Sequence, residues 1–177
     1  MSPLLTVDGL TVEYVPAEPV LREVSLTVDV GEIVAVVGES GSGKTTLART
    51  VLGLLPSSAR VTGGSADLAG TVLTDADART WRALRGRLLG YVPQDPGTSL
   101  NPSRRVGSQV VEALRAHRIG RARDEEAVRA LTAAGLREPE RVARAWPHEL
   151  SGGMRQRALI AGAFVAGPRL IVADEPT

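Results

Sequence analysis

Apolar residues gather in short runs along the chain, in two patterns. Residues 33–37, 88–92 and 170–173 are almost wholly apolar. Uninterrupted runs of this length predict strands that are buried on both faces of a parallel sheet. Residues 4–15 and 20–30 instead alternate loosely and are rich in Val, Leu and Thr, which predicts antiparallel strands joined by a turn at 16–19.

A helical pattern follows the first apolar run, over residues 44–55. Its apolar positions recur every three or four residues and should therefore face the sheet. These positions are Leu47, Val51, Leu54 and Leu55. After this helix we expect a short hairpin at 64–73 and an exposed basic helix at 77–87.

The second half of the chain contains a block of predicted helices. Residues 106–117, 124–134 and 138–145 combine helical periodicity with many Arg and Glu residues. This block lies between the second and third apolar runs. The pattern therefore predicts an α/β fold with an inserted helical part.

The composition limits the possible chemistry. A hydrophobic content of 43% in 177 residues is enough for a buried core. The net charge of +1 gives no basic field, so no nucleic-acid partner is expected. These residues lack Cys, which excludes disulfides and Cys-ligated metals. The longest uncharged apolar run, 158–168, is too short to span a bilayer, so membrane association should go through another protein.

The first apolar run ends at a glycine-rich stretch with the spacing of a phosphate-binding loop. Its residues are Gly38, Glu39, Ser40, Gly41, Ser42, Gly43, Lys44 and Thr45, with Thr46 continuing into the helix. The glycines permit backbone N–H groups to turn inward around an anion, and the helix N-terminus adds unpaired donors. Lys44 would add a full charge at the β- and γ-phosphates, and the Thr45 hydroxyl could ligate Mg2+.

The composition sets Lys44 apart. Of the 21 basic residues, 20 are Arg, and Lys44 is the only Lys. A compact ammonium on a flexible stem can enter a ring of backbone amides where a planar guanidinium cannot. This use of Lys favours a phosphate-binding loop over a chance glycine-rich turn.

Two further polar or aromatic residues have more than one interpretation. Tyr14, in the first alternating segment, could stack on a nucleobase or serve in ordinary packing. Gln94 follows the second apolar run and begins a proline-rich loop. Its amide could ligate a metal or orient a water molecule, or it could simply stabilise the turn. The residues alone leave these alternatives open.

Two more candidate sites lie near the end of the chain. Ser151 fits a helix N-cap, and Gly152 and Gly153 would let the backbone approach an anion closely. Asp174 and Glu175 follow the third apolar run, at the strand end where ligands of open α/β sheets bind. Asp174 would hold Mg2+, and Glu175 could polarise an attacking water.

Taken together, these motifs resemble the nucleotide-binding subunit of an ABC transporter. The resemblance rests on the phosphate loop, Gln94, LSGGMRQ at 150–156 and LIVADE at 170–175, in that order. It implies ATP and Mg2+ as ligands, Tyr14 as the adenine-stacking aromatic, Gln94 as a metal ligand, and catalytic roles for Lys44, Gln94 and Glu175. It also implies that Ser151, Gly152 and Gly153 face the ATP of a partner subunit.

The resemblance implies a domain plan as well. The fold would be a P-loop NTPase of the ABC ATPase type. Residues 1–94 and 163–177 would form the nucleotide-binding core with an N-terminal antiparallel β-subdomain, and residues 95–162 the helical subdomain. The chain stops at Thr177, before the switch histidine and dimer-contacting loop of that family. A truncated domain is therefore expected, and the chain alone should hydrolyse ATP negligibly.

Within the family, QDP at 94–96 and SLNP at 99–102 look like the loop of importer ATPases for oligopeptides, dipeptides and nickel. LSGGMRQRALIA at 150–161 looks like the first of their two paralogues. The implied partners are a second ABC ATPase subunit, identical or a paralogue, two membrane permeases and, indirectly, an extracytoplasmic solute-binding protein. The expected location is peripheral, at the cytoplasmic face of the membrane.

Two other functions remain open on the sequence alone. One is a soluble ABC ATPase that does not serve transport. The other is a non-catalytic remnant that binds nucleotide without turnover.

Overall fold

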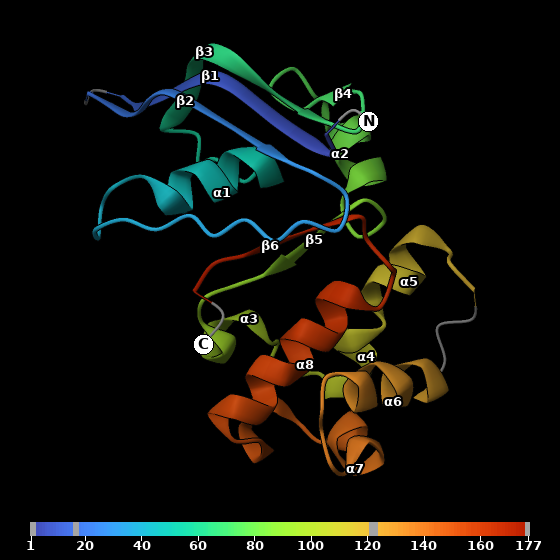
Figure 1. The fold of residues 1–177 in the computed structure, drawn as a ribbon. Coiled ribbons are helices and arrows are strands. Elements are labelled where there is room, and N and C mark those ends of the chain that lie inside the picture. Colours follow the sequence, from blue (N-terminus) through green and yellow to red (C-terminus); the bar gives the residue numbers. More distant parts are fainter. Residues whose placement is uncertain (1–2, 16–17, 121–123, 176–177) are drawn as a thin grey trace. The chain divides into compact units, whose positions relative to one another are not determined.

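The structure is a computed structural model that describes residues 3–15, 18–120 and 124–175. The internal contacts divide the chain into two units, Met1–Arg82 and Ala83–Thr177 (Figure 1). Each unit has its own sheet.

The first unit contains a four-stranded antiparallel sheet. Its strands are β1 (Leu5–Tyr14), β2 (Pro19–Val28), β3 (Ala59–Leu68) and β4 (Thr71–Val72), in the order β2-β1-β3-β4. Alternate apolar side chains of β1 are buried, as expected for an antiparallel strand. The predicted pairing of the first two segments is confirmed, although residues 16–17 of the predicted turn lie outside the described part. The predicted hairpin is present, but its first strand begins at Ala59 rather than at residue 64.

Helix α1 (Lys44–Leu52) contacts β2 of this sheet. Leu47 and Val51 are buried, as predicted. Leu54, however, is 45% exposed, because the helix ends at Leu52 and its C-cap Gly53 adopts a left-handed backbone with φ 63°. Helix α2 (Ala78–Leu84) follows, and its Leu84 is buried.

The first apolar run was predicted to be a buried strand, and this prediction is wrong for the structure. Residues 33–37 form an irregular, extended segment between β2 and α1 (Figure 1). Ile33 is 97% exposed and Val37 is 88% exposed. A run of β-branched residues forms a strand only where a neighbouring strand supplies hydrogen bonds and cover. Among the described residues, no strand pairs with this segment.

The second and third apolar runs do form strands, in the second unit. β5 (Leu89–Val92) and β6 (Leu170–Ala173) pair in parallel, with Val92 opposite Ala173. The backbone N–H of Asp174 also donates to the carbonyl of Val92, at 3.0 Å. The carboxyl ends of both strands therefore lie at one edge, followed by residues 93–94 and 174–175.

The second unit also contains several helices besides α8 (Gly152–Phe164). They are α3 (Pro96–Ser99), α4 (Val106–Val110), α5 (Glu112–His117), α6 (Asp124–Ala133), α7 (Pro139–Arg144) and the 3-10 helix Pro147–Glu149. Helix α8 contacts β5 as well as α3, α4 and α6. One apolar cluster joins α4, α6, α7 and α8; its largest members are Val106, Val110, Leu131, Leu136, Val142 and Leu150.

Two features of these helices were not predicted. Residues 106–117 form two helices rather than one, because Val111 has φ −90° and ψ 12° and interrupts the helical backbone. Gln156 in α8 is only 9% exposed, and its side-chain amide has no hydrogen-bond partner among the described residues.

None of the helices in the described ranges is long and apolar enough to cross a membrane.

Candidate nucleotide-binding site

The predicted phosphate loop curls into the N-terminus of α1. Gly41 and Gly43 have φ values of 83° and 94°, in the left-handed region that favours glycine. A Cβ at Gly43 would also lie 2.6 Å from Cδ2 of Leu21, so any larger residue there would force the Leu21 side chain to shift. No side chain in the described part of the chain caps α1, and its first turn has no acidic residue, which leaves the N–H groups of this turn for an anion.

The ammonium of Lys44 lies against the same loop. Its Nζ donates to the carbonyl oxygens of Gly38 and Glu39, at 2.8 and 2.7 Å. An ammonium has three N–H donors, so these two bonds leave one for a phosphate oxygen. The loop residues Glu39, Ser40, Gly41 and Ser42 are exposed, and Thr45 is half-buried.

Tyr14 lies beside the first turn of α1. Its hydroxyl is 3.4 Å from the hydroxyl of Thr46, which is buried. The strand β1 thus brings the predicted stacking aromatic next to the phosphate loop, within the first unit.

The edge formed by β5 and β6 carries the other predicted catalytic groups. Nε2 of Gln94 donates to Oε2 of Glu175, at 2.6 Å. Asp174 is half-buried, whereas Gln94 and Glu175 are exposed. Glu175 has φ 46°, a left-handed conformation that is uncommon outside glycine. Parallel pairing of two strands far apart in sequence therefore places an amide, two carboxylates and a strained backbone at one edge.

The chain after Gln94 is fixed by a capped turn. The Asp95 carboxylate accepts from the backbone N–H of Gly97 at 2.7 Å and from the Thr98 hydroxyl at 3.1 Å. These bonds hold the pKa of Asp95 below its ordinary value of 3.8, because they stabilise the ionised form. The bond from the Gly97 N–H has the largest effect. Asp95 is the N-cap of α3, whose first residue is Pro96.

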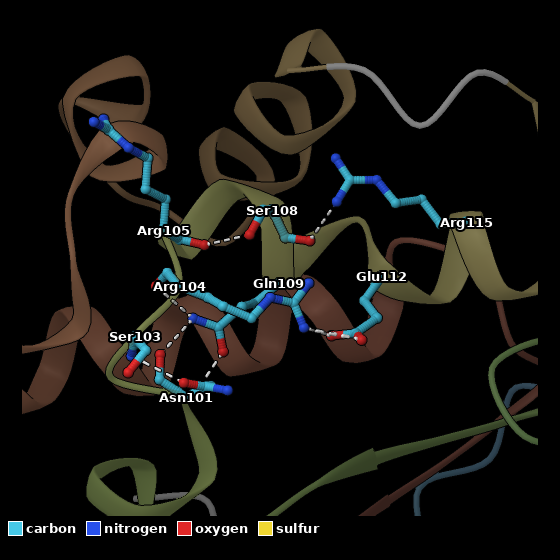
Figure 2. Close-up of polar contacts among 8 residues, drawn as sticks. All are labelled: Asn101, Ser103, Arg104, Arg105, Ser108, Gln109, Glu112 and Arg115. Atoms are coloured by element: carbon cyan, nitrogen blue, oxygen red, sulfur yellow. Dashed lines mark hydrogen bonds and ion pairs between the residues drawn. The ribbon is translucent and has the colours of Figure 1, made fainter.

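The rest of the proline-rich loop is tied to α4 by Gln109 (Figure 2). The Gln109 amide accepts from the N–H of Asn101 at 2.8 Å and donates to the carbonyls of Asn101 and Arg104, at 3.1 and 2.9 Å. Asn101 in turn accepts from the N–H of Ser103 at 2.9 Å. Arg104 also forms an ion pair with Glu112, at 3.0 Å. These bonds tie the proline-rich loop to α4, in keeping with the shaped loop that its prolines predicted.

The N-terminus of α8 is built as the sequence predicted. Ser151 is the N-cap, and its Oγ accepts from the backbone N–H of Met154 at 3.3 Å. Ser151, Gly152 and Gly153 are all exposed, and a Cβ on either glycine would meet nothing within 4 Å. A pocket of about 440 Å³ lies beside this turn, and its lining includes Ser151, Gly153, Arg137, Arg141 and Arg157.

The predicted magnesium donors suit that ion. They are the Thr45 hydroxyl, the Gln94 amide oxygen and the Asp174 carboxylate, which are hard oxygen ligands of the kind Mg2+ prefers. No group of three or more His, Cys, Asp or Glu side chains in the described ranges could hold a metal by itself. Thr45 lies in the first unit and Gln94 and Asp174 in the second, so each donor fits Mg2+ by its own chemistry.

Several residues that shape the site were missed by sequence reasoning. Leu21 fills the space beneath Gly43, and Gln109 locks the proline-rich loop. Nε of Arg155 donates to the carbonyl of Leu150 at 3.1 Å, just before the N-cap of α8. For Asp95 a signal was present, since Asp followed by Pro is typical of a helix start. For Leu21, Gln109 and Arg155 no sequence motif marks the contact, which forms only when the chain folds.

A glycine-rich loop with an inward lysine at the start of a helix defines a nucleotide-binding protein of the P-loop class. The ABC transporter family matches residues 21–177, and the chain therefore belongs to that family. This confirms the family predicted from the sequence motifs.

Its relatives include transport ATP-binding proteins. The chain is 46% identical over its whole length to the oligopeptide transport ATP-binding protein OppD of Mycobacterium tuberculosis, covering 30% of that protein. It is 40% identical to OppD of Salmonella typhimurium, with 98% of the chain and 54% of the relative covered. It is 39% identical to the dipeptide transport ATP-binding protein DppD of Lactococcus lactis, with 89% and 46% covered. The chain thus spans about a third to a half of these relatives.

Solved structures confirm the predicted fold class. The ATP-binding cassette MJ0796, in a dimeric post-hydrolysis state bound to ADP and Pi, superposes with a TM-score of 0.85. The two sequences are 29% identical, and the match covers 98% of this chain and 74% of that one.

Proposed function

We propose that this chain binds and hydrolyses ATP as part of a subunit that energises peptide import through separate membrane permeases. The observation that carries the proposal is the phosphate loop. Its left-handed glycines, the uncapped start of α1 and the inward Lys44 together form an anion cradle. A β- or γ-phosphate is the ligand such a cradle suits best.

Each predicted group then has a chemical role. Lys44 and the N–H groups of α1 hold the phosphates and stabilise charge on the transferred group. Thr45, Gln94 and Asp174 would hold Mg2+, which neutralises charge on the phosphate oxygens. Glu175 accepts a proton from the attacking water or polarises it. Tyr14 stacks on the adenine.

The exposed start of α8 has its proposed role in a dimer. Ser151, Gly152 and Gly153 would contact the γ-phosphate of the ATP bound by a second ABC ATPase subunit. The open space around both glycines and the arginine-lined pocket beside them support this role. The MJ0796 cassette, a neighbour in structure, is itself dimeric.

The names of the relatives favour peptides as the solute over nickel. OppD and DppD are described as oligopeptide and dipeptide transport proteins. The proposed assembly contains two membrane permeases and works indirectly with an extracytoplasmic solute-binding protein. The subunit would then lie peripherally at the cytoplasmic face of the membrane.

The test is magnesium-dependent phosphate release by the complete gene product, assembled with its ATPase partner. Wild-type protein should hydrolyse ATP. Glu175→Gln should still bind ATP but stop turnover, because an amide cannot accept the proton, and the ATP-bound dimer should accumulate on gel filtration. Hydrolysis by the variant at the wild-type rate would show that Glu175 is not the base.

A further inference from the structure

The pocket of about 440 Å³ in the second unit is lined by the turn that joins α6 to α7 and by the first turns of α8 (Figure 1). Its lining includes three guanidinium groups, those of Arg137, Arg141 and Arg157, and one carboxylate, that of Glu138. Two positive charges in the lining are therefore left without a carboxylate to balance them. All of these residues belong to the second unit, whereas the phosphate loop belongs to the first.

The turn between α6 and α7 is held in one shape by a glycine cap. Helix α6 ends at Ala133, and Gly135 adopts a left-handed backbone with φ 78°. The N–H of Gly135 donates to the carbonyl of Thr132, at 2.9 Å. The N–H of Leu136 donates to the carbonyl of Leu131, at 3.1 Å. This pair of bonds closes the helix in a defined turn, and the contact of Leu136 with the apolar cluster anchors that turn.

Two of the three arginines are each held at one end. Nη1 of Arg157 donates to the carbonyl of Gly135, at 2.6 Å. Nε of Arg141 donates to Oε2 of Glu138, at 2.8 Å. A guanidinium has five N–H donors, so both arginines keep donors for a ligand. None of the ion pairs within the described ranges involves Arg137, which is exposed. Planar groups with spare paired donors suit phosphate oxygens.

Another part of the lining is apolar. Leu136 is 7% exposed, and Met154 is partly buried against the same apolar cluster. The flexible, polarizable side chain of Met adapts to ligands of different shapes. The volume is within the range of pockets that hold small organic molecules. Cationic and apolar groups in one pocket therefore fit an organic phosphate better than a bare inorganic ion.

We propose that this pocket is a regulatory site for a small organic phosphate. Ser151 and Gly153 also line the pocket, so its occupant would lie against them. Both residues are proposed above to meet the γ-phosphate of the partner's ATP. A phosphate ester held by the arginines blocks that contact and lowers turnover by the dimer. The inhibition rests on the proposed function, whereas the binding of the ester does not.

Binding is tested with phenyl phosphate, which joins one phosphate to an apolar ring. The full gene product carries Lys44→Ala, so that the phosphate loop does not compete for the probe. Calorimetry should show one site, and Kd should rise by about 3- to 10-fold in Arg137→Gln and in Arg141→Gln, because each loses a charged donor. Arg144→Gln, also on α7 but outside the pocket, is the matched control and should bind the probe as before.

Three results of this titration would overturn the inference. The first is the absence of binding, and the second is equal binding in all of the variants. The third is an equal affinity for inorganic phosphate, which lacks the ring and should bind more weakly than phenyl phosphate.

Regulation is tested by magnesium-dependent phosphate release in the gene product with intact Lys44, assembled with its ATPase partner. Phenyl phosphate should inhibit hydrolysis even at saturating ATP. Arg137→Gln should need about 3- to 10-fold more of the probe to halve its own uninhibited rate. Inhibition that saturating ATP removes would place the probe in the phosphate loop and overturn the regulatory role. Wild-type protein without hydrolysis would instead contradict the proposed function, while the titration still decides whether the pocket binds the ester.

Discussion

The phenol oxygen of Tyr14 lies 3.4 Å from the hydroxyl oxygen of Thr46. The last residue of β1 thus meets the first turn of α1, directly after the phosphate loop. A substitution at Tyr14 can therefore weaken ATP binding in two ways, by removing a contact with the adenine or by disturbing the phosphate loop.

Tyr14→Ala should weaken ATP binding by about tenfold or more, because stacking on one base is worth roughly 1–3 kcal/mol. Tyr14→Phe keeps the ring and should keep the affinity. Calorimetric titration with ATP measures both, and tripolyphosphate, which has no base, is the control ligand. An equal loss for tripolyphosphate would mean that Tyr14 supports the loop rather than the adenine.

Lys44→Ala should abolish measurable ATP binding, since it removes the charge held inside the loop. The loss of one preorganised donor of this kind costs roughly 3–4 kcal/mol. Lys44→Arg should also bind poorly, because the guanidinium is planar and too wide for the amide ring. Arg49→Ala, near the end of the same helix, is the matched control and should bind normally. Equal ATP affinity in wild type and Lys44→Ala would contradict the assignment of this loop as the phosphate-binding site.

Gly153→Ala should leave the fold intact and yet reduce hydrolysis by the assembled dimer. Its Cβ would meet no described residue within 4 Å, but it would intrude where the partner's phosphate is proposed to lie. Gly43→Ala is the contrasting variant, because its φ of 94° and its contact with Leu21 should lower the free energy of unfolding by about 1–3 kcal/mol. Urea unfolding measures the stability of the two variants, and phosphate release measures their turnover. Normal turnover in Gly153→Ala contradicts the proposed role.

Gln156→Met should raise the free energy of unfolding by about 1–2 kcal/mol. The buried amide has no partner among the described residues, so an apolar side chain of similar size removes a desolvation cost. Gln109→Met is the control and should destabilise, because Gln109 makes three hydrogen bonds to the proline-rich loop. Urea denaturation measures both. Destabilisation by Gln156→Met would indicate a bound water at this amide.

Acid should open the turn at α3. The pKa of Asp95 is lowered in the folded chain, first by the N–H of Gly97, so its contribution to stability is present above 3.8. That contribution is lost as the pH falls through the lower, folded pKa. Hydrogen exchange at the Gly97 amide should therefore be slow near neutral pH and lose its protection in acid. Asp95→Asn keeps a capping oxygen that does not titrate, so its protection should not follow the pH in this way.

Local signals account for most of what the sequence predicted. Glycine spacing located the loop around Lys44, and Ser151 before two glycines located the N-cap of α8. Both depend on residues within a few positions of each other. The runs at 88–92 and 170–173 were predicted to be strands from their composition, and this is correct because the two segments pair with each other.

The errors arise where a distant residue decides the outcome. Residues 33–37 have the composition of a strand, but strand formation requires a partner that no pattern within the segment can supply. The break at Val111 and the bond from Gln94 to Glu175 also depend on tertiary placement. The sequence therefore located the candidate residues, whereas the contacts among them required the structure.

The single lysine of these 177 residues has a practical consequence. An amine-selective acylating reagent has one side-chain target here, Lys44, besides the chain's α-amino group. That target is already held by the carbonyls of Gly38 and Glu39, and a bound triphosphate should shield it further. The fraction of Lys44 left unlabelled, measured by mass spectrometry, would thus report the fraction of phosphate loops that hold a nucleotide. The twenty arginines do not react with the reagent.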